Sequence, residues 1–461
     1  MSILAAYMVP HPPMIVPAIG RGSEAQIPAT IQAYQEIARD VARLRPDTLI
    51  ITSPHQIMYR DYFHISPGSR ASGSFSQFRA PQVTFQESYD TALVQEISRL
   101  ADEAGLPAGT MGERDKQLDH GTMVPLWFIR NVYPDGRIVR IGLSGLPLAD
   151  HYRLGMLIQQ AVNALGRRAV FIASGDLSHK LQSYGPYGFA PEGPAYDERI
   201  MDVMGRGAFG ELFDFSEDFC NKAAECGHRS FVIMAGALDG RGVRAEALSH
   251  EDVTGVGYGI CRFIPEAEDQ DRRFLSILNE KELAEICEKS ARSDAYVRLA
   301  RQAVEAYVSR KERLAVPKNL PSDILEEKAG AFVSIHEHGL LRGCIGTILP
   351  CETNLAEEII SNAISACSRD PRFNQILPDE LPYLDITVDV LGKPEDITSP
   401  DQLDVKRYGV IVTYGRKRGL LLPDLEGVDT VSDQISIARQ KGGIREDDPY
   451  SLQRFEVIRH Y

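Results

Sequence analysis

The sequence predicts an α/β protein of two domains, an N-terminal α/β sandwich followed by a smaller α+β domain. Its 461 residues exceed what a single hydrophobic core usually organises. Up to about residue 265, apolar runs of strand length alternate with segments of helical periodicity, which is typical of sheets covered by helices. Beyond that point, short strands, helices and glycine turns follow one another without regular alternation.

The N-terminal elements follow from the spacing of apolar residues. Short continuous apolar runs indicate buried strands, and apolar residues three or four positions apart indicate helices. The predicted strands are 4–9, 47–53, 137–143, 168–174 and 257–263. The predicted helices are 24–44, 95–104 and 229–239.

A polar, charged stretch (PEAEDQDRR) separates the two regions. It predicts a linker at 266–280 between domains at 1–265 and 281–461. In the second domain we expect a helical stretch at 280–310, an alternating strand at 384–391, and a hairpin of 409–412 with 419–423. The basic run that begins at Arg416 is interpreted as the tip of this hairpin.

Composition excludes several classes of protein. The net charge of −14 argues against a nucleic-acid-binding surface, which needs a basic stripe. No apolar run reaches the roughly 18 residues that a membrane span requires, and the N-terminus lacks the basic region of a signal peptide. The seven cysteines form no Cys-x-x-Cys pair, so we expect reduced thiols and a cytoplasmic location.

Four histidines occupy positions typical of a binding site. His11, His55 and His179 each follow a predicted strand, and His120 precedes an apolar helix. Ligands of open α/β sheets bind beyond the carboxyl ends of the strands. The placement therefore predicts a site at this edge of the sheet.

The strings HPP, SPH, DHGTMVPL and SGDLSH together resemble the class III extradiol dioxygenase (LigB) superfamily, whose fold Memo proteins share. The resemblance covers residues 1–265 and implies a metal bound by His11, His55 and a late carboxylate, for which Glu225 is the candidate. Fe(2+) suits two imidazoles and a carboxylate, and Zn(2+) is the alternative. The resemblance assigns proton transfer to His179 and His120.

Other residues near these motifs have more than one interpretation. Asp119 and Asp176 either orient the imidazoles or cap loops and helices. Memo-type proteins carry a cysteine near the position of Glu225, so Cys226 is an alternative residue of the site. His228 either faces the site or begins a helix.

The string LRGCIGT, followed by ACSRDPRF, resembles the AMMECR domain family from about residue 290 onward. We expect a cleft there that contains Arg342, Cys344, Thr347, Asp370 and Arg372. Arg342 could bind a carboxylate or phosphate, and Cys344 could be a reactive thiol. In the alternative interpretation, Cys344 is a small buried strand residue and the glycines form a bulge.

Together the two resemblances imply a non-haem metal-dependent oxidoreductase that acts on a small, catechol-like substrate. The alternative is a metal-binding component of a modification system with a separate radical-SAM protein, without ring cleavage. A non-catalytic scaffold is the third hypothesis. The resemblance also implies a homodimer.

Overall fold

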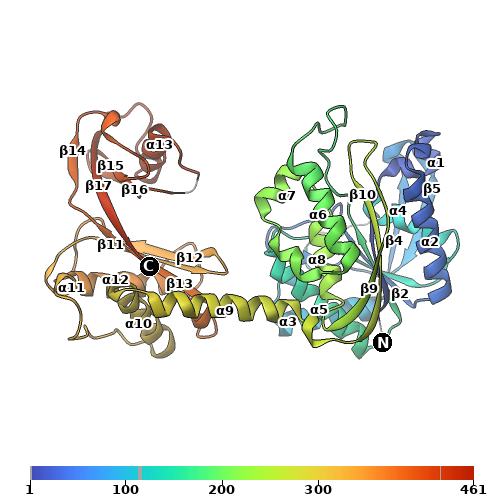
Figure 1. The fold of residues 1–461 in the computed structure, drawn as a ribbon, viewed down its shortest axis with the longest axis horizontal. Coiled ribbons are helices and arrows are strands. Elements are labelled where there is room, and N and C mark those ends of the chain that lie inside the picture. Colours follow the sequence, from blue (N-terminus) through green and yellow to red (C-terminus); the bar gives the residue numbers. More distant parts are fainter. Residues whose placement is uncertain (1–2, 113–116, 426) are drawn as a thin grey trace. The chain divides into compact units, whose positions relative to one another are not determined.

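The computed structural model describes residues 3–112, 117–425 and 427–461. The chain divides into two compact units between Leu278 and Asn279 (Figure 1). This division lies inside the segment predicted as a linker, 266–280. That segment contains the end of a strand, a 3-10 turn (η5, Gln270–Arg272) and the start of helix α9 (Phe274–Arg292).

The N-terminal unit is built on a six-stranded sheet of order β7-β2-β8-β1-β10-β9. The strands β7, β2, β8 and β1 are parallel, while β10 and β9 continue the sheet antiparallel. Every residue of β2 and β8 is buried, as expected for a sheet covered on both faces. The strands are β1 (Ile3–Val9), β2 (Thr48–Ser53), β7 (Arg137–Gly142), β8 (Ala169–Ser174), β9 (Arg241–Glu251) and β10 (Tyr258–Glu268).

Helices cover both faces of this sheet (Figure 1). Alternate residues of β1 belong to different cores: Ala6 and Met8 pack with one set of helices, Tyr7 and Val9 with the other. The first set is α3 (Thr91–Glu103), α5 (Leu148–Ala164), α6 (Glu192–Arg206) and α8 (His228–Gly236). The second set is α2 (Pro28–Leu44) and α4 (His120–Arg130). The α/β fold predicted for this half is confirmed.

Smaller elements surround this framework. Of these, the hairpin of β4 (Arg70–Phe75) and β5 (Ala80–Ser88) bears on the site described below. The others are α1 (Pro17–Gly20), α7 (Glu217–Ala223), β3 (Phe63–His64), β6 (Ala108–Gly109), η1 (Pro13–Ile15), η2 (Ser23–Gln26), η3 (Ser76–Phe78) and η4 (Phe209–Asp214).

The predicted boundaries differ from the observed ones where local chemistry decides them. The helix predicted from residue 24 begins at Pro28, because proline is favoured in the first turn of a helix. Strand β9 was not predicted, since its sequence RGVRAEALSHE is polar and it lies only partly buried at the edge of the sheet. Its partner β10 extends to Glu268, five residues beyond the predicted end.

The C-terminal unit contains a seven-stranded sheet of order β12-β11-β13-β17-β15-β16, with β14 beside β17. Helices α10 and α12 pack against β11 and β13, and α13 packs against β15 and β16. The strands are β11 (Ala331–Glu337), β12 (Leu340–Gly346), β13 (Leu384–Leu391), β14 (Glu395–Ile397), β15 (Tyr408–Tyr414), β16 (Lys417–Leu421) and β17 (Ser451–His460). The helical elements are α10 (Ala295–Arg310), α11 (Ser322–Glu326), α12 (Leu355–Ser368), α13 (Val431–Lys441), η6 (Leu381–Tyr383) and η7 (Pro400–Gln402).

The predicted strand 384–391 and the predicted hairpin are both present, and the α+β class is confirmed. The helical stretch predicted at 280–310 is present, as the end of α9 followed by α10. Ser293 and Asp294 interrupt the helical conformation between α9 and α10. The Asp294 carboxylate accepts the backbone N–H groups of Tyr296 and Val297. Aspartate favours such an N-cap over a helix interior, so a new helix starts there.

Among the described residues, no helix is long and apolar enough to cross a membrane.

The end of β8 and the start of α8 approach so closely that only glycine fits. A Cβ atom on Gly175 would lie 2.1 Å from the Cα atom of Gly227. We expect Gly175→Ala to lower the free energy of unfolding of the N-terminal unit by about 1–3 kcal/mol, because the backbone must separate. Chemical denaturation followed by circular dichroism measures the loss.

Gly205→Ala in α6 is the matched control. Its added Cβ would meet Ala247 at 3.6 Å, an ordinary contact, and alanine gains up to about 1 kcal/mol in a helix interior. An equal effect of the two substitutions would contradict the tight crossing.

Candidate metal centre

Two histidines and a cysteine converge at the carboxyl edge of the N-terminal sheet. His11 follows β1, His55 follows β2, and Cys226 lies just before α8. One ligand atom from each lies within 4.8 Å of the other two. The Nε2 atoms of His11 and His55 are 3.0 Å apart, and the Sγ of Cys226 is 3.8 Å from Nε2 of His11.

These separations fit ligands of one ion. With metal–nitrogen bonds of about 2.1 Å and metal–sulfur bonds of about 2.3 Å, two nitrogens on one ion lie roughly 3.0–3.4 Å apart, and nitrogen and sulfur about 3.6 Å. The three residues could therefore hold a metal ion. Two imidazoles and a thiol suit iron and zinc.

Hydrogen bonds fix the orientation of His11. Its Nδ1 lies 2.9 Å from the Ser174 hydroxyl, which itself donates to the carbonyl oxygen of Gly121. The hydroxyl therefore accepts from the Nδ1–H of His11, and Nε2 keeps the lone pair that faces His55 and Cys226. Burial, aided by the neighbouring His55, holds the pKa of His11 well below its usual value, so the ring is neutral near pH 7.

Asp119 ties together the segments that carry the histidines. Its carboxylate accepts the Ser53 hydroxyl at 2.5 Å, and the N–H and hydroxyl of Thr122 at 3.0 and 2.8 Å. It also lies 3.7 Å from the buried guanidinium of Arg140. Burial raises the pKa of Asp119, but Arg140 and these donors outweigh it and keep the pKa below its usual value. Of its two predicted roles, Asp119 takes the cap, at the start of α4.

His120 is the first residue of α4 and lies beside both histidines of the centre. Its ring centroid is 3.9 Å from that of His55 and 5.4 Å from that of His11. Burial, followed by the two neighbouring imidazoles, lowers the pKa of His120 to about 3. His120 is thus a neutral imidazole near pH 7, and its nitrogen lone pair can accept a hydrogen bond at the site.

The loop after β8 brings Asp176 and His179 to the same edge. The backbone N–H of Asp176 donates to Sγ of Cys226. One carboxylate oxygen of Asp176 accepts the backbone N–H of His11. Burial raises the pKa of Asp176. The ring of His179 stacks on Tyr187 at 5.0 Å and 24° and, among the described residues, makes no hydrogen bond. Stacking therefore orients this imidazole.

The structure separates two of the predicted site residues from this centre. Glu225, expected as the third ligand, accepts the N–H of His228 at 2.6 Å and lies outside the group of three. Burial raises the pKa of Glu225 to about 7. His228 is buried between the hydroxyl of Tyr196 and the carbonyl of Leu212.

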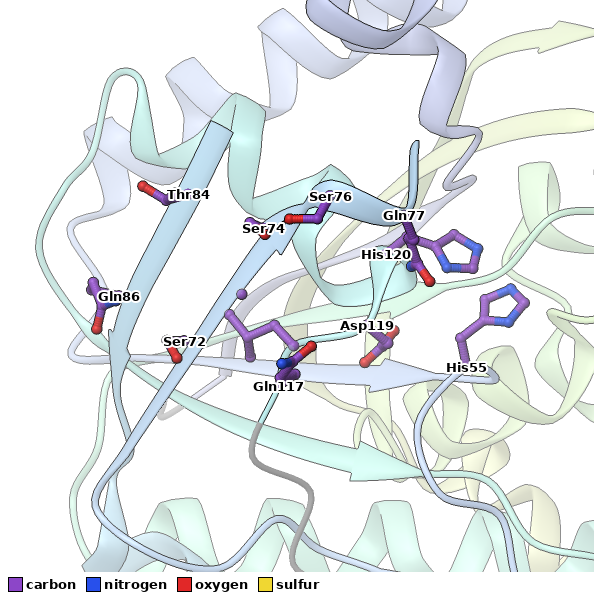
Figure 2. A pocket seen from close by; sticks show the side chains of 12 residues that line it. His55, Ser72, Ser74, Ser76, Gln77, Thr84, Gln86, Gln117, Asp119 and His120 are labelled. Carbon is purple, nitrogen blue, oxygen red and sulfur yellow. Dashed lines mark hydrogen bonds between the residues drawn. The ribbon is translucent and has the colours of Figure 1, made fainter. Parts of the chain in front are cut away.

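A groove of about 740 Å³ opens beside His55 and His120 (Figure 2). Its walls are mostly hydroxyl and carboxamide groups, which sequence reasoning missed. The available signal was the alternation of serine with small or aromatic residues in 71–76, and of polar with aromatic residues in 84–86. The lining residues are His55, Ser72, Gly73, Ser74, Ser76, Gln77, Thr84, Gln86, Gln117, Leu118, Asp119 and His120.

In the C-terminal unit, each of the five predicted cleft residues forms hydrogen bonds or ion pairs with other residues of the same chain. The guanidinium of Arg342 donates to Glu380 and to the carbonyls of Asn374 and Gln375, so its fork is occupied. The hydroxyl of Thr347 donates to Glu358.

The remaining three lie together. Asp370 accepts the N–H of Cys344 at 2.9 Å and pairs with Arg372, which lowers the pKa of Asp370 to about 2. The thiol of Cys344 is half-buried and accepts the Ser334 hydroxyl at 3.2 Å.

Comparison with known families matches both units. Residues 5–261 match the family described as catalytic LigB subunit of aromatic ring-opening dioxygenase, and residues 297–460 match AMMECR1. The chain belongs to the LigB family and carries an AMMECR1 domain. The resemblance inferred from the four N-terminal strings and from LRGCIGT is thereby confirmed.

Two relatives align with all or part of this chain. Protein CA_C1420 of Clostridium acetobutylicum is 42% identical over 469 aligned positions, covering 100% of this chain and 99% of its own. A Thermotoga maritima protein is 48% identical over 36% of this chain and 96% of its own.

Two solved structures overlap parts of the chain. The uncharacterized protein PH0010 from Pyrococcus horikoshii is 31% identical, with a TM-score of 0.34, over 36% of this chain and 88% of its own. The uncharacterized protein JW3007 from Escherichia coli K12 is 16% identical, with a TM-score of 0.37, over 56% of this chain and 99% of its own.

Removing the Asp119 carboxylate should loosen the site edge. We expect Asp119→Ala to cost about 1–3 kcal/mol of unfolding free energy, through loss of the α4 cap and of an acceptor near buried Arg140. Asp119→Asn keeps an acceptor and should cost less. In the folded protein the pKa of Asp119 is below its usual value of 3.8. The wild type should therefore have the higher free energy of unfolding above about pH 4, and its difference from the Asn variant should decrease at lower pH. Denaturation of the three proteins at pH 7 and pH 3 tests this, and equal stability at pH 7 would count against it.

Tyr187 should control the titration of His179. Burial lowers the pKa of His179, so removing the stacked ring in Tyr187→Ala should move that pKa upward toward 6.5. Tyr187→Phe keeps the stacked ring and should leave the pKa of His179 unchanged. Tyr184→Ala removes an exposed tyrosine nearby in the sequence and should also leave it unchanged. Histidine NMR titration, assigned with His179→Gln, measures the shift. An unchanged pKa in Tyr187→Ala would remove Tyr187 from this role.

Proposed function

We propose that the N-terminal domain is a metal-dependent oxidoreductase resembling ring-opening dioxygenases, with His11, His55 and Cys226 as ligands. The observation that carries the proposal is the convergence of these three ligand atoms within 4.8 Å. Fe(2+) is the proposed metal. Zn(2+) is the alternative, because a thiol is a softer ligand than the carboxylate expected from the sequence. When bound, such an ion would polarise substrate oxygen atoms and hold them next to the histidines.

The residues around the ligands supply proton transfer. His120 and His179 are neutral near pH 7 because burial lowers both pKa values. A neutral imidazole can accept the proton that leaves a substrate hydroxyl on binding and return it later. The reacting group would carry adjacent hydroxyls, as a catechol does. His55, the exposed member of the group of three, lies where the groove meets the centre.

A second candidate function is a metal-binding component of a radical-SAM-associated modification system without ring cleavage. Two observations favour it. Cys226, and not Glu225, is the third residue beside the histidines, so the ligand set differs from two histidines and a carboxylate. The fused AMMECR1 domain also adds a unit that ring cleavage by itself does not require.

Metal content distinguishes the ligand set from its neighbours. We expect about one iron or zinc per chain in protein purified without oxygen, and at least about a ten-fold weaker metal affinity in His11→Ala and in Cys226→Ser. Glu225→Gln should retain metal, because that carboxylate contacts His228. Cys287→Ser, at an exposed thiol outside the group, is the control.

Elemental analysis and competition with a chelator measure these affinities. Metal loss in Glu225→Gln with retention in Cys226→Ser would reverse the ligand assignment. Ring-opened product from oxygen and a panel of catechols would support the oxidoreductase. Bound metal without turnover of any catechol would favour the second function.

A further inference from the structure

One face of the β4–β5 hairpin presents only polar side chains. The strand register places Ser72 opposite Gln86 and Ser74 opposite Thr84, and because side chains alternate in a strand, these four share a face. The other face of the hairpin is buried in the core. Side chains on one face are about 7 Å apart along a strand and about 5 Å apart across the pair. The patch is therefore comparable in size to one sugar ring.

The segment 117–120 forms the wall of the groove beside this floor. The N–H of Leu118 donates to the carbonyl of Ser72 at 2.9 Å, which fixes the wall against β4. Figure 2 shows that the floor leads to His55 and His120, with Gln77 near that end. A molecule in the groove would reach the candidate metal centre at one end.

The groove carries little charge. Among its described lining residues, Asp119 is the one carboxylate, and no lysine or arginine occurs. That carboxylate is already bonded to Ser53 and Thr122 and lies beside Arg140. An anionic ligand would find no counter-charge here, and the net charge of −14 would repel it. A neutral ligand fits.

The chemistry of the lining distinguishes among neutral ligands. Hydroxyls and carboxamides each donate and accept hydrogen bonds, and a polyol offers the same pairing at close spacing. An unsubstituted aromatic ring would cover these groups and leave them without partners, which costs free energy. An extended peptide is recognised partly through recesses for apolar side chains, and Leu118 is the one large apolar residue among the described lining.

We propose that the groove binds a neutral, polyhydroxylated part of the substrate, a sugar or a related polyol, and directs the reacting end toward His55 and His120. The part of this proposal that concerns the reacting end of the substrate depends on the proposed metal-dependent function. The recognition of the polyol depends on the hairpin and can be measured without metal.

The test is binding of metal-free, full-length protein to an array of neutral mono-, di- and trisaccharides and cyclitols, with positives confirmed by calorimetry. Catechol and a neutral alanine peptide amide are the comparison probes. The variant is Thr84→Val with Gln86→Leu, which removes two polar groups from an exposed face and should leave the fold intact. The control is Gln82→Leu, an exposed residue of β5 that does not line the groove.

We expect at least one saccharide or cyclitol to bind, with about ten-fold or greater weakening in the double variant and none in the control. Binding by sugars or by cyclitols alone would identify which polyol is recognised. No binding of any neutral polyol, equal binding by the double variant, or binding of catechol or peptide alone would overturn the proposal.

The metal content of the same preparations distinguishes a failure of the proposed metal-dependent function from a failure of the polyol-binding groove. Polyol binding by a protein that never retains metal would defeat the proposed function and leave the groove assignment. Metal retention without polyol binding would defeat the groove assignment alone.

Discussion

The parallel pairing of β8 with both β1 and β2 is the constraint on which the candidate centre depends. The register places Ser174 opposite Val9, and Ala173 opposite Thr52, so the three strands end at one level. His11 and His55 each follow two residues beyond a strand end, and the carboxyl ends of parallel strands share an edge. A register shift of one residue in β1 would turn its buried side chains to the other face and displace His11.

Hydrogen bonds between these ends then orient the side chains. Ser174 at the end of β8 holds the ring of His11, and Asp119 bonds Ser53 at the end of β2. The Gly175–Gly227 contact brings the turn that carries Cys226 against the same edge. Each of these contacts joins residues far apart in the chain. The geometry of the centre is therefore a property of the folded sheet.

Burial at this edge opposes charge, which has chemical consequences. The pKa values of the histidines are lowered and the pKa of the Cys226 thiol is raised by the same desolvation. Neutral imidazoles are ready to bind a cation or accept a proton. A protonated thiol must lose its proton before it becomes a strong ligand, and a bound cation would favour that loss. The groove, by contrast, offers mostly neutral hydrogen-bonding groups, with Asp119 as the one carboxylate among its described lining residues.

The sequence by itself determined the fold class of each half, most buried strands, and the placement of His11, His55, His120 and His179, because apolar periodicity and strand-end position are local properties. It missed the polar edge strand β9 and the groove, whose character depends on which elements lie beside them. The sequence also could not decide between Glu225 and Cys226. Ala224 just before them adopts a left-handed conformation with φ of 53°, and the two adjacent side chains point to different partners: Glu225 to the first turn of α8, Cys226 to the loop after β8. Only the tertiary structure decides such a choice, because the direction of a side chain on a turn is set by the segments packed around it.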